Sequence, residues 1–240
     1  MIRALLLTLA MAITAHAQTA GLASVRVYKF GGRSTQQANY DNLPDGYGSG
    51  WLITKTQVIT AYHVVHNNRG GDKPLQVRFA DGWRSWATVI DVDIENDIAL
   101  LWVNPHETIE PIPLGTIPDR GKRIAIHGYG YDYEFATHFG QIVNRMRNSV
   151  IPDNFRGDRE AYLLANYANM NGTADTDDEG NWQAVYVVST PGDSGGPVTY
   201  NGKAIGCVLS ITDTHSIIAR IDYIQERFGD KLKHSVLRIK

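Results

Sequence analysis

Short runs of β-branched and other apolar residues recur along this sequence between Gly, Asp and Asn breaks. Such runs predict antiparallel β-structure, because parallel βαβ units need helical segments of about 10 to 15 residues between successive strands. We therefore expect an all-β fold built as barrels or as a sandwich. The runs of the first half are 24–28, 50–54, 57–60, 75–79, 87–92 and 98–103; those of the second half are 123–127, 140–144, 184–188, 197–200, 204–211 and 216–221.

Two segments depart from the strand pattern. Residues 156–167 could be helical, and together with the polar, acidic run after them they predict an inserted surface loop at about 145–182. Residues 223–232 place Ile224, Phe228 and Leu232 at helical spacing, which predicts a C-terminal amphipathic helix. The sequence thus divides into two β-rich halves, 18–110 and 119–240, joined by a linker at 111–118.

The first seventeen residues predict a cleaved signal peptide. Arg3 precedes an apolar run at 4–13, and Ala15-His16-Ala17 has the small-x-small form of a cleavage site. A membrane anchor is the alternative, but the run is too short for about 30 Å of hydrocarbon. We expect a secreted or periplasmic protein with no stable membrane association after cleavage.

Composition excludes some partners. With 43% apolar residues, the 240-residue chain can bury a sizeable core, and its formal net charge of -2 gives no electrostatic reason to bind nucleic acid. Cys207 is the only cysteine, so no intramolecular disulfide can form. Its apolar run, 204–209, favours a buried small hydrophobe over a thiol nucleophile.

An acidic cluster is the one candidate metal site. It consists of Asp175, Asp177, Asp178 and Glu179, whose oxygens could gather around Ca²⁺. The twelfth position counted from Asp175 is Tyr186, so an EF-hand would lack its bidentate Glu. A solvated acidic loop is the favoured interpretation, and no metal and no cofactor is expected.

The strongest chemical signal is Pro191-Gly192-Asp193-Ser194-Gly195-Gly196-Pro197. Glycine has no Cβ, so backbone N–H groups in such a loop can converge on one point, as a serine nucleophile requires for its developing oxyanion. Gly192 N–H and Ser194 N–H are the candidate donors. Taken alone, a Gly-Ser-Gly segment is more often a plain turn.

Two further segments strengthen the interpretation. Thr60-Ala61-Tyr62-His63-Val64-Val65 places a histidine just past a predicted strand, and an imidazole is suited to take a proton from a hydroxyl at neutral pH. Asn96-Asp97-Ile98-Ala99-Leu100-Leu101 opens another strand with an acid that could orient the imidazole. By itself the histidine could be structural and the aspartate a turn former.

Together, and in the order His63, Asp97, Ser194, these segments resemble the chymotrypsin-like (trypsin-like) serine peptidases. Subtilisin-like and α/β-hydrolase enzymes have other chain orders. Gly128-Tyr129-Gly130 and Ile217-Ile218-Ala219-Arg220-Ile221 also resemble family segments. The resemblance implies two antiparallel six-stranded β-barrels with a C-terminal α-helix and a triad in the cleft between them.

The sequence also departs from part of that family. In vertebrate digestive relatives a new amino terminus pairs with the aspartate that corresponds to Asp193, and no matching start lies near Gln18. Bacterial branches without disulfides or this activation, including Deg-type proteases, are more similar. A Deg-type enzyme would carry a PDZ module after the barrels.

The resemblance assigns the primary specificity pocket to six residues. Val188 and Ser189 would form its base, Leu209, Ser210 and Ile211 one wall, and Ser216 the other. Val188 gives no countercharge for Arg or Lys, and Ile211 would narrow the pocket, so a small aliphatic P1 residue is expected. A glutamate-preferring site through His215 and Ser189 is the alternative.

The predicted function is therefore a secreted serine endopeptidase, expected to be a monomer, that hydrolyses protein or peptide substrates through an acyl-enzyme on Ser194. The alternative is a catalytically silent peptide-binding protein on the same scaffold.

Overall fold

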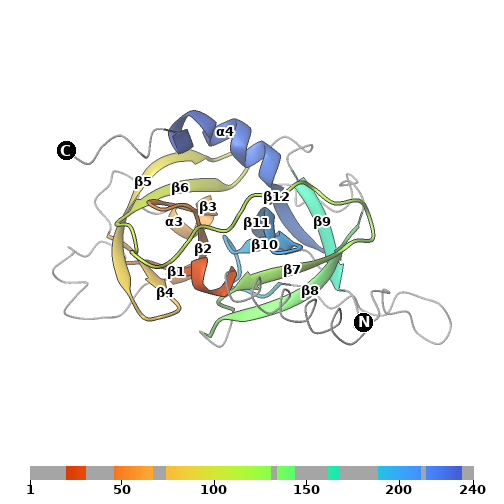
Figure 1. The fold of residues 1–240 in the computed structure, drawn as a ribbon, viewed down its shortest axis with the longest axis horizontal. Coiled ribbons are helices and arrows are strands. Elements are labelled where there is room, and N and C mark those ends of the chain that lie inside the picture. Colours follow the sequence, from red (N-terminus) through yellow and green to blue (C-terminus); the bar gives the residue numbers. More distant parts are fainter. Residues whose placement is uncertain are drawn as a thin grey trace, which may run out of the picture.

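The computed structural model describes residues 20–30, 46–66, 74–130, 134–143, 162–167, 189–211 and 215–233. Within these residues, two antiparallel six-stranded barrels lie side by side, with a C-terminal helix across the first (Figure 1). The expected fold class is confirmed. The predicted signal peptide, the predicted strand at 184–188 and the acidic cluster at 175–179 lie outside the described residues.

The first barrel closes in the order β1-β2-β3-β6-β5-β4. Its strands are β1 (Ser24–Lys29), β2 (Gly46–Thr54), β3 (Gln57–Ala61), β4 (Leu75–Phe79), β5 (Arg84–Asp93) and β6 (Ile98–Val103), and the short helix α3 (Tyr62–Val65) follows β3. All of β3 and all of β6 except Trp102 are buried, which explains their continuous apolar runs. Closure leaves no free edge, because β1 pairs with both β2 and β4.

The second barrel closes in the order β10-β11-β12-β9-β8-β7. Its strands are β7 (Arg123–Gly128), β8 (Ala136–Ile142), β9 (Tyr162–Tyr167), β10 (Pro197–Tyr200), β11 (Lys203–Ile211) and β12 (Ser216–Arg220). Its core is aliphatic and includes Ile126, Val198 and Ile218. The predicted helix is wrong over residues 162–167, which form β9 inside the segment expected to be a surface loop. The cause is non-local: β9 pairs with β12, with Ala165 opposite Ser216, and with β8, with Gly140 opposite Tyr167.

Helix α4 (Ile221–Lys233) begins where β12 ends and crosses the first barrel (Figure 1). Ile224 and Phe228 are buried in the same core cluster as the first-barrel residues, so the predicted amphipathic helix is confirmed. No helix among the described residues is long and apolar enough to cross a membrane.

Backbone hydrogen bonds join the two barrels along their shared face. Ser49 N–H donates to Ser194 O at 2.8 Å, Ile112 N–H to Leu52 O at 3.2 Å, and Gly115 N–H to Ala204 O at 2.8 Å. The segment after the first barrel therefore runs between the barrels and hydrogen-bonds to each. The predicted limits of the linker and of the two halves stay predictions.

Candidate active site

His63 and Asp97 come from two neighbouring strands of the first barrel. His63 lies in α3, directly after β3, and Asp97 lies directly before β6, which pairs with β3. His63 Nδ1 lies 2.7 Å from Asp97 Oδ2, and the backbone N–H of His63 donates to Asp97 Oδ1 at 2.8 Å. Tyr62 N–H donates to the carbonyl oxygen of Asp97 at 2.9 Å. Two contacts thus fix the carboxylate against His63, and a third fixes the backbone of Asp97.

This geometry determines the tautomer of His63. A carboxylate only accepts hydrogen bonds, so Nδ1 carries the proton that it donates to Asp97. Nε2 then has a free lone pair. The Asp97 side chain is 16% exposed and that of His63 is 49% exposed, so the imidazole reaches the cleft while its carboxylate partner is shielded.

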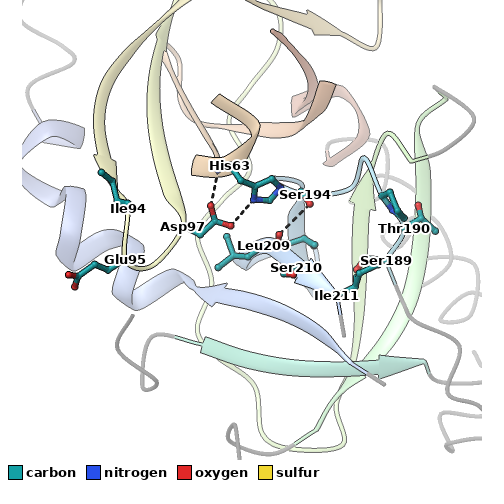
Figure 2. Close-up of a pocket in the computed structure, with 12 residues that line it drawn as sticks. His63, Ile94, Glu95, Asp97, Ser189, Thr190, Ser194, Leu209, Ser210 and Ile211 are labelled. Atoms are coloured by element: carbon teal, nitrogen blue, oxygen red, sulfur yellow. Dashed lines mark hydrogen bonds and ion pairs between the residues drawn. The ribbon is translucent and has the colours of Figure 1, made fainter. Parts of the chain in front are cut away.

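Ser194 lies on the loop before β10 and faces the same cleft as His63 (Figure 2). Its hydroxyl donates to the carbonyl oxygen of Leu209 at 3.3 Å, and within the described residues no hydrogen bond joins it to His63. In serine nucleophile sites without substrate, catalytic hydrogen bonds are often long and tighten only when substrate binds.

Two glycines of this loop have backbone conformations that other residues rarely adopt. Gly192 has a φ of 103° and Gly195 a φ of 90°. A Cβ on Gly195 would lie 2.0 Å from Ser49 O and 2.4 Å from Thr60 Oγ1. The glycines therefore allow both the turn and the close approach of the loop to β2 and β3.

Ser49 is a residue of the site that sequence reasoning missed. Its side chain is fully buried; Oγ donates to Gly192 O at 2.7 Å and accepts from Tyr129 N–H at 2.9 Å. Its backbone N–H also donates to Ser194 O. Ser49 thus binds the carbonyl groups of Gly192 and Ser194, the residues on either side of Asp193. Its position between two glycines, directly before an apolar strand, was the available signal.

Asp193 is fully buried beneath the nucleophile loop. Its Oδ2 accepts from Thr190 N–H at 2.8 Å and from Thr190 Oγ1 at 3.0 Å, and His138 Nε2 lies 3.7 Å away. Burial raises the pKa of Asp193, against the opposing effects of the Thr190 hydrogen bonds and the charge of His138. Among the described residues, Thr190 and His138 therefore occupy the place expected of a partner for this carboxylate.

The cleft has a volume of about 580 Å³. Residues that sequence reasoning placed in it form part of its lining: His63, Asp97, Ser189, Ser194, Leu209, Ser210 and Ile211. Sequence reasoning missed five others: Ile94, Glu95, Thr190, Pro191 and Val208. Each of these is a near neighbour in sequence of Asp97, Gly192 or Leu209.

Four of the six residues predicted to form the specificity pocket line the cleft: Ser189, Leu209, Ser210 and Ile211. Ser189 Oγ lies 2.7 Å from Ser216 Oγ, and both side chains are buried, so two hydroxyls satisfy each other where Ser189 meets the cleft. Ile211 is 37% exposed at the cleft wall. Burial lowers the pKa of His215, which favours its neutral form. Val188 lies outside the described residues.

Two antiparallel six-stranded barrels whose shared cleft brings together His63, Asp97 and Ser194 define the chymotrypsin-like class of serine peptidases. Comparison with known proteins agrees, because the trypsin-like peptidase domain family matches residues 48–206. This chain belongs to that family.

Individual relatives share a low sequence identity with this chain. The chain is 25% identical over 191 residues to "Serine protease HTRA4" of Mus musculus, a match that covers 78% of this chain and 35% of the relative. It is 32% identical over 81 residues to "Serine protease HTRA3" of Homo sapiens, covering 32% of this chain and 18% of the relative. The longer of these matches spans about a third of its relative's length.

Solved structures share the fold. The Rv3671c protease in its inactive form aligns with a TM-score of 0.62 at 21% identity, covering 92% of this chain and 94% of that one. The serine endoprotease from Yersinia pestis aligns with a TM-score of 0.63 at 18% identity, covering 92% of this chain and 66% of that one.

Proposed function

We propose that this protein is a serine endopeptidase that cleaves protein or peptide substrates through an acyl-enzyme on Ser194. One observation carries the proposal: His63, held by Asp97 through 2.7 Å and 2.8 Å contacts, lies in one cleft with a serine on a glycine-rich loop. Membership of the trypsin-like peptidase family supports the same chemistry.

In the proposed mechanism, Ser194 Oγ leaves its contact with Leu209 and attacks the carbonyl carbon of the scissile bond. Its proton passes to His63 Nε2, and Asp97 stabilises the imidazolium. Gly192 N–H and Ser194 N–H are the proposed donors to the oxyanion. His63 then gives the proton to the leaving amine nitrogen, and water hydrolyses the ester by the same route.

A fluorophosphonate probe tests this proposal against a silent binding protein on the same scaffold. It reacts with an activated serine hydroxyl, so the wild type should become labelled at Ser194 and the Ser194→Ala variant should stay unlabelled. Peptide mapping of the labelled site is the measurement. A wild type that resists the probe while binding peptides would favour the silent protein.

We further propose that the P1 residue is small and aliphatic. Ile211 lines the cleft, and the Ser189 hydroxyl already bonds to that of Ser216. Peptide-library profiling should rank Ala and Val above Phe and far above Arg, with differences among aliphatic residues of about 10- to 200-fold. Ile211→Gly should admit Phe.

Other cleavage preferences would contradict the proposed specificity pocket and leave the proposed catalytic mechanism unaffected. Preferred cleavage after Arg or Lys would exclude the assignment of Val188 to the base. Preferred cleavage after Glu would instead support the alternative site at His215 and Ser189.

Export by the segment at 1–17 and a monomeric state remain part of the proposal. The small-x-small site at Ala15-His16-Ala17 supports the first. N-terminal sequencing and size-exclusion chromatography of the exported protein would test both.

A further inference from the structure

The backbone of Asp97 has a conformation that needs external support. Its φ is 55°, in the left-handed region that a non-glycine residue seldom occupies unless its surroundings hold it there. Since Asp97 contacts His63 with both carboxylate oxygens, any relaxation of this backbone would also turn the carboxylate away from the imidazole.

The residue before it, Asn96, is held by hydrogen bonds. Its backbone N–H donates to Asp93 Oδ1 at 3.1 Å and its Nδ2 to Asp93 Oδ2 at 2.9 Å. Asn96 is 5% exposed and Asp93 9% exposed, so water competes little for these contacts. Asp93 and Asn96 thus close the turn between β5 and β6 that ends at Asp97.

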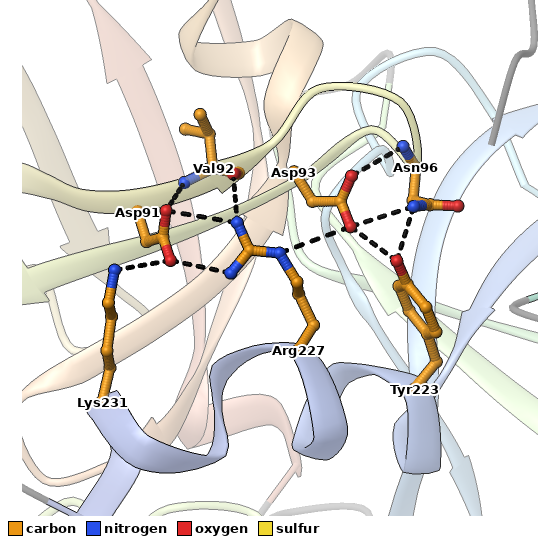
Figure 3. A network of polar contacts seen from close by, with 7 residues as sticks. All are labelled: Asp91, Val92, Asp93, Asn96, Tyr223, Arg227 and Lys231. Atoms are coloured by element: carbon orange, nitrogen blue, oxygen red, sulfur yellow. Dashed lines mark hydrogen bonds and ion pairs between the residues drawn. The ribbon is translucent and has the colours of Figure 1, made fainter. Parts of the chain in front are cut away.

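Tyr223, in the first turn of α4, completes this arrangement (Figure 3). Its hydroxyl donates to Asp93 Oδ2 at 2.6 Å and accepts from Asn96 Nδ2 at 2.5 Å. Burial and the hydrogen bond to Asp93 raise the pKa of Tyr223, so the hydroxyl keeps the proton that it donates. One side chain of α4 therefore contacts both polar residues of the turn.

Two other side chains of α4, Arg227 and Lys231, hold the helix to β5. Arg227 donates to Asp91 Oδ2 at 2.8 Å and to Val92 O at 2.8 Å, and Lys231 Nζ donates to Asp91 Oδ2 at 2.6 Å. Arg227 Nε also lies 3.6 Å from Asp93 Oδ2 (Figure 3). Lys231 therefore stabilises the docked helix without contacting the turn, which makes it a matched control.

We infer that Tyr223 is a positioning residue for the reaction, and that it keeps Asp97 aligned with His63 through Asp93 and Asn96. This inference rests on the proposed role of Asp97. The hydroxyl bonds to both polar residues of the turn that ends at Asp97, and no described residue of α4 lines the cleft, so the C-terminal helix would contribute to catalysis without lining the substrate site.

The experiment compares Tyr223→Phe with Lys231→Met and Asp97→Asn in the full-length protein. Phe keeps the ring and removes only the hydroxyl. We expect Tyr223→Phe to lower kcat about tenfold with KM within about twofold, since small misplacements of a catalytic group reduce the rate and not ground-state binding. The acid limb of the kcat/KM profile should also move to lower pH, because a misaligned Asp97 stabilises the imidazolium less.

Charged groups near the turn could also move the acid limb of the kcat/KM profile. They are Asp91 and Asp93 on β5, Glu95 in the turn, Arg227 and Lys231 on α4, and the pair of His63 and Asp97 itself. Lys231→Met removes one of them and loosens the helix, yet it should leave kcat and the acid limb unchanged. Thermal unfolding of each variant reports how far it is destabilised.

Each other outcome overturns a specific statement. Wild-type kcat and acid limb in Tyr223→Phe, with Asp97→Asn inactive, would refute the role of Tyr223 and leave the proposed function intact. Equal kinetic changes in Lys231→Met and Tyr223→Phe at equal loss of stability would show a general effect of helix docking and also refute it. Near wild-type activity in Asp97→Asn would refute the proposed function itself.

Discussion

Ser194→Ala and His63→Ala are each expected to lower kcat by about 10⁴- to 10⁶-fold while the protein stays folded. Without Ser194 there is no hydroxyl to form the acyl-enzyme, and without His63 the imidazole proposed to take the hydroxyl proton is lost. Removing either member should therefore remove nearly all of the rate that depends on covalent catalysis.

The double variant gives the sharper test of this prediction. Residues that act as a unit are not additive, so Ser194→Ala combined with His63→Ala should be about as slow as either single variant. Active-site titration, single-turnover hydrolysis of a peptide ester and circular dichroism are the measurements. His66→Ala, an exposed histidine directly after α3, is the control and should keep wild-type kcat.

Additive losses in the double variant, or hydrolysis near the wild-type rate in either single variant, would contradict the assignment. So would loss of activity that tracks unfolding, because Ser194 and His63 both face the cleft and not a core cluster.

Each of the three proposed triad residues lies in a local pattern of the sequence. His63 follows the apolar strand β3, Asp97 precedes the apolar strand β6, and Ser194 lies among glycines whose φ values of 103° and 90° require that residue type. The pairing of β3 with β6 inside the first barrel places His63 beside Asp97.

Non-local contacts account for what the sequence did not predict. The segment 162–167 has no strict alternation, and its strand conformation depends on pairing with β12, about fifty residues later. Ser49 reads as an ordinary polar residue, and only the approach of the second barrel gives its hydroxyl the carbonyl of Gly192 as acceptor. The contact between Tyr223 and Asn96 likewise joins residues that are 127 positions apart in the sequence.

The second large effect is expected in the stability of the protein in acid, through His127. This imidazole is 1% exposed, with Nδ1 2.9 Å from Thr137 Oγ1 and Nε2 2.8 Å from Thr199 Oγ1. The ring of Phe135 stacks on it at 6.0 Å and 7°. Burial, and secondarily the charge of His138, lowers the pKa of His127 to about 4.

The folded and the unfolded protein differ in the pH at which His127 binds a proton. In the unfolded chain an imidazole binds a proton below about pH 6.5, whereas folded His127 stays neutral until about pH 4, so between these values the unfolded state binds more protons. The free energy of unfolding should therefore fall as the pH is lowered from 6.5 to 4 and lose no more through this group below that. The total loss is about 3 kcal/mol, from about 1.4 kcal/mol per pH unit.

His127→Gln tests this prediction, since an amide can still bridge the two threonine hydroxyls but does not titrate. Urea unfolding of wild type and variant at pH 7, 6, 5 and 4 should give curves whose separation changes by about 3 kcal/mol across the window, with the variant losing less. Titrating groups other than His138, whose charge acts on His127, act equally in both proteins and cancel in the difference. A curve for His127→Gln that runs parallel to that of the wild type would refute the prediction.

Protonation of His127 should also displace the loop that carries Ser194. A Cβ on Gly196 would lie 2.1 Å from the carbonyl oxygen of His127, and a Cβ on the next residue, Gly128, would lie 2.4 Å from Asp193 Oδ1. Backbone packing this close cannot absorb the displacement of a charged imidazole without moving the loop that carries Ser194. Fluorophosphonate labelling of Ser194 is assayed at neutral pH immediately after incubation at pH 4. It should therefore recover more completely in His127→Gln than in the wild type. Equal recovery in the two proteins would show that protonation of His127 changes the stability of the barrel and not the geometry of the loop.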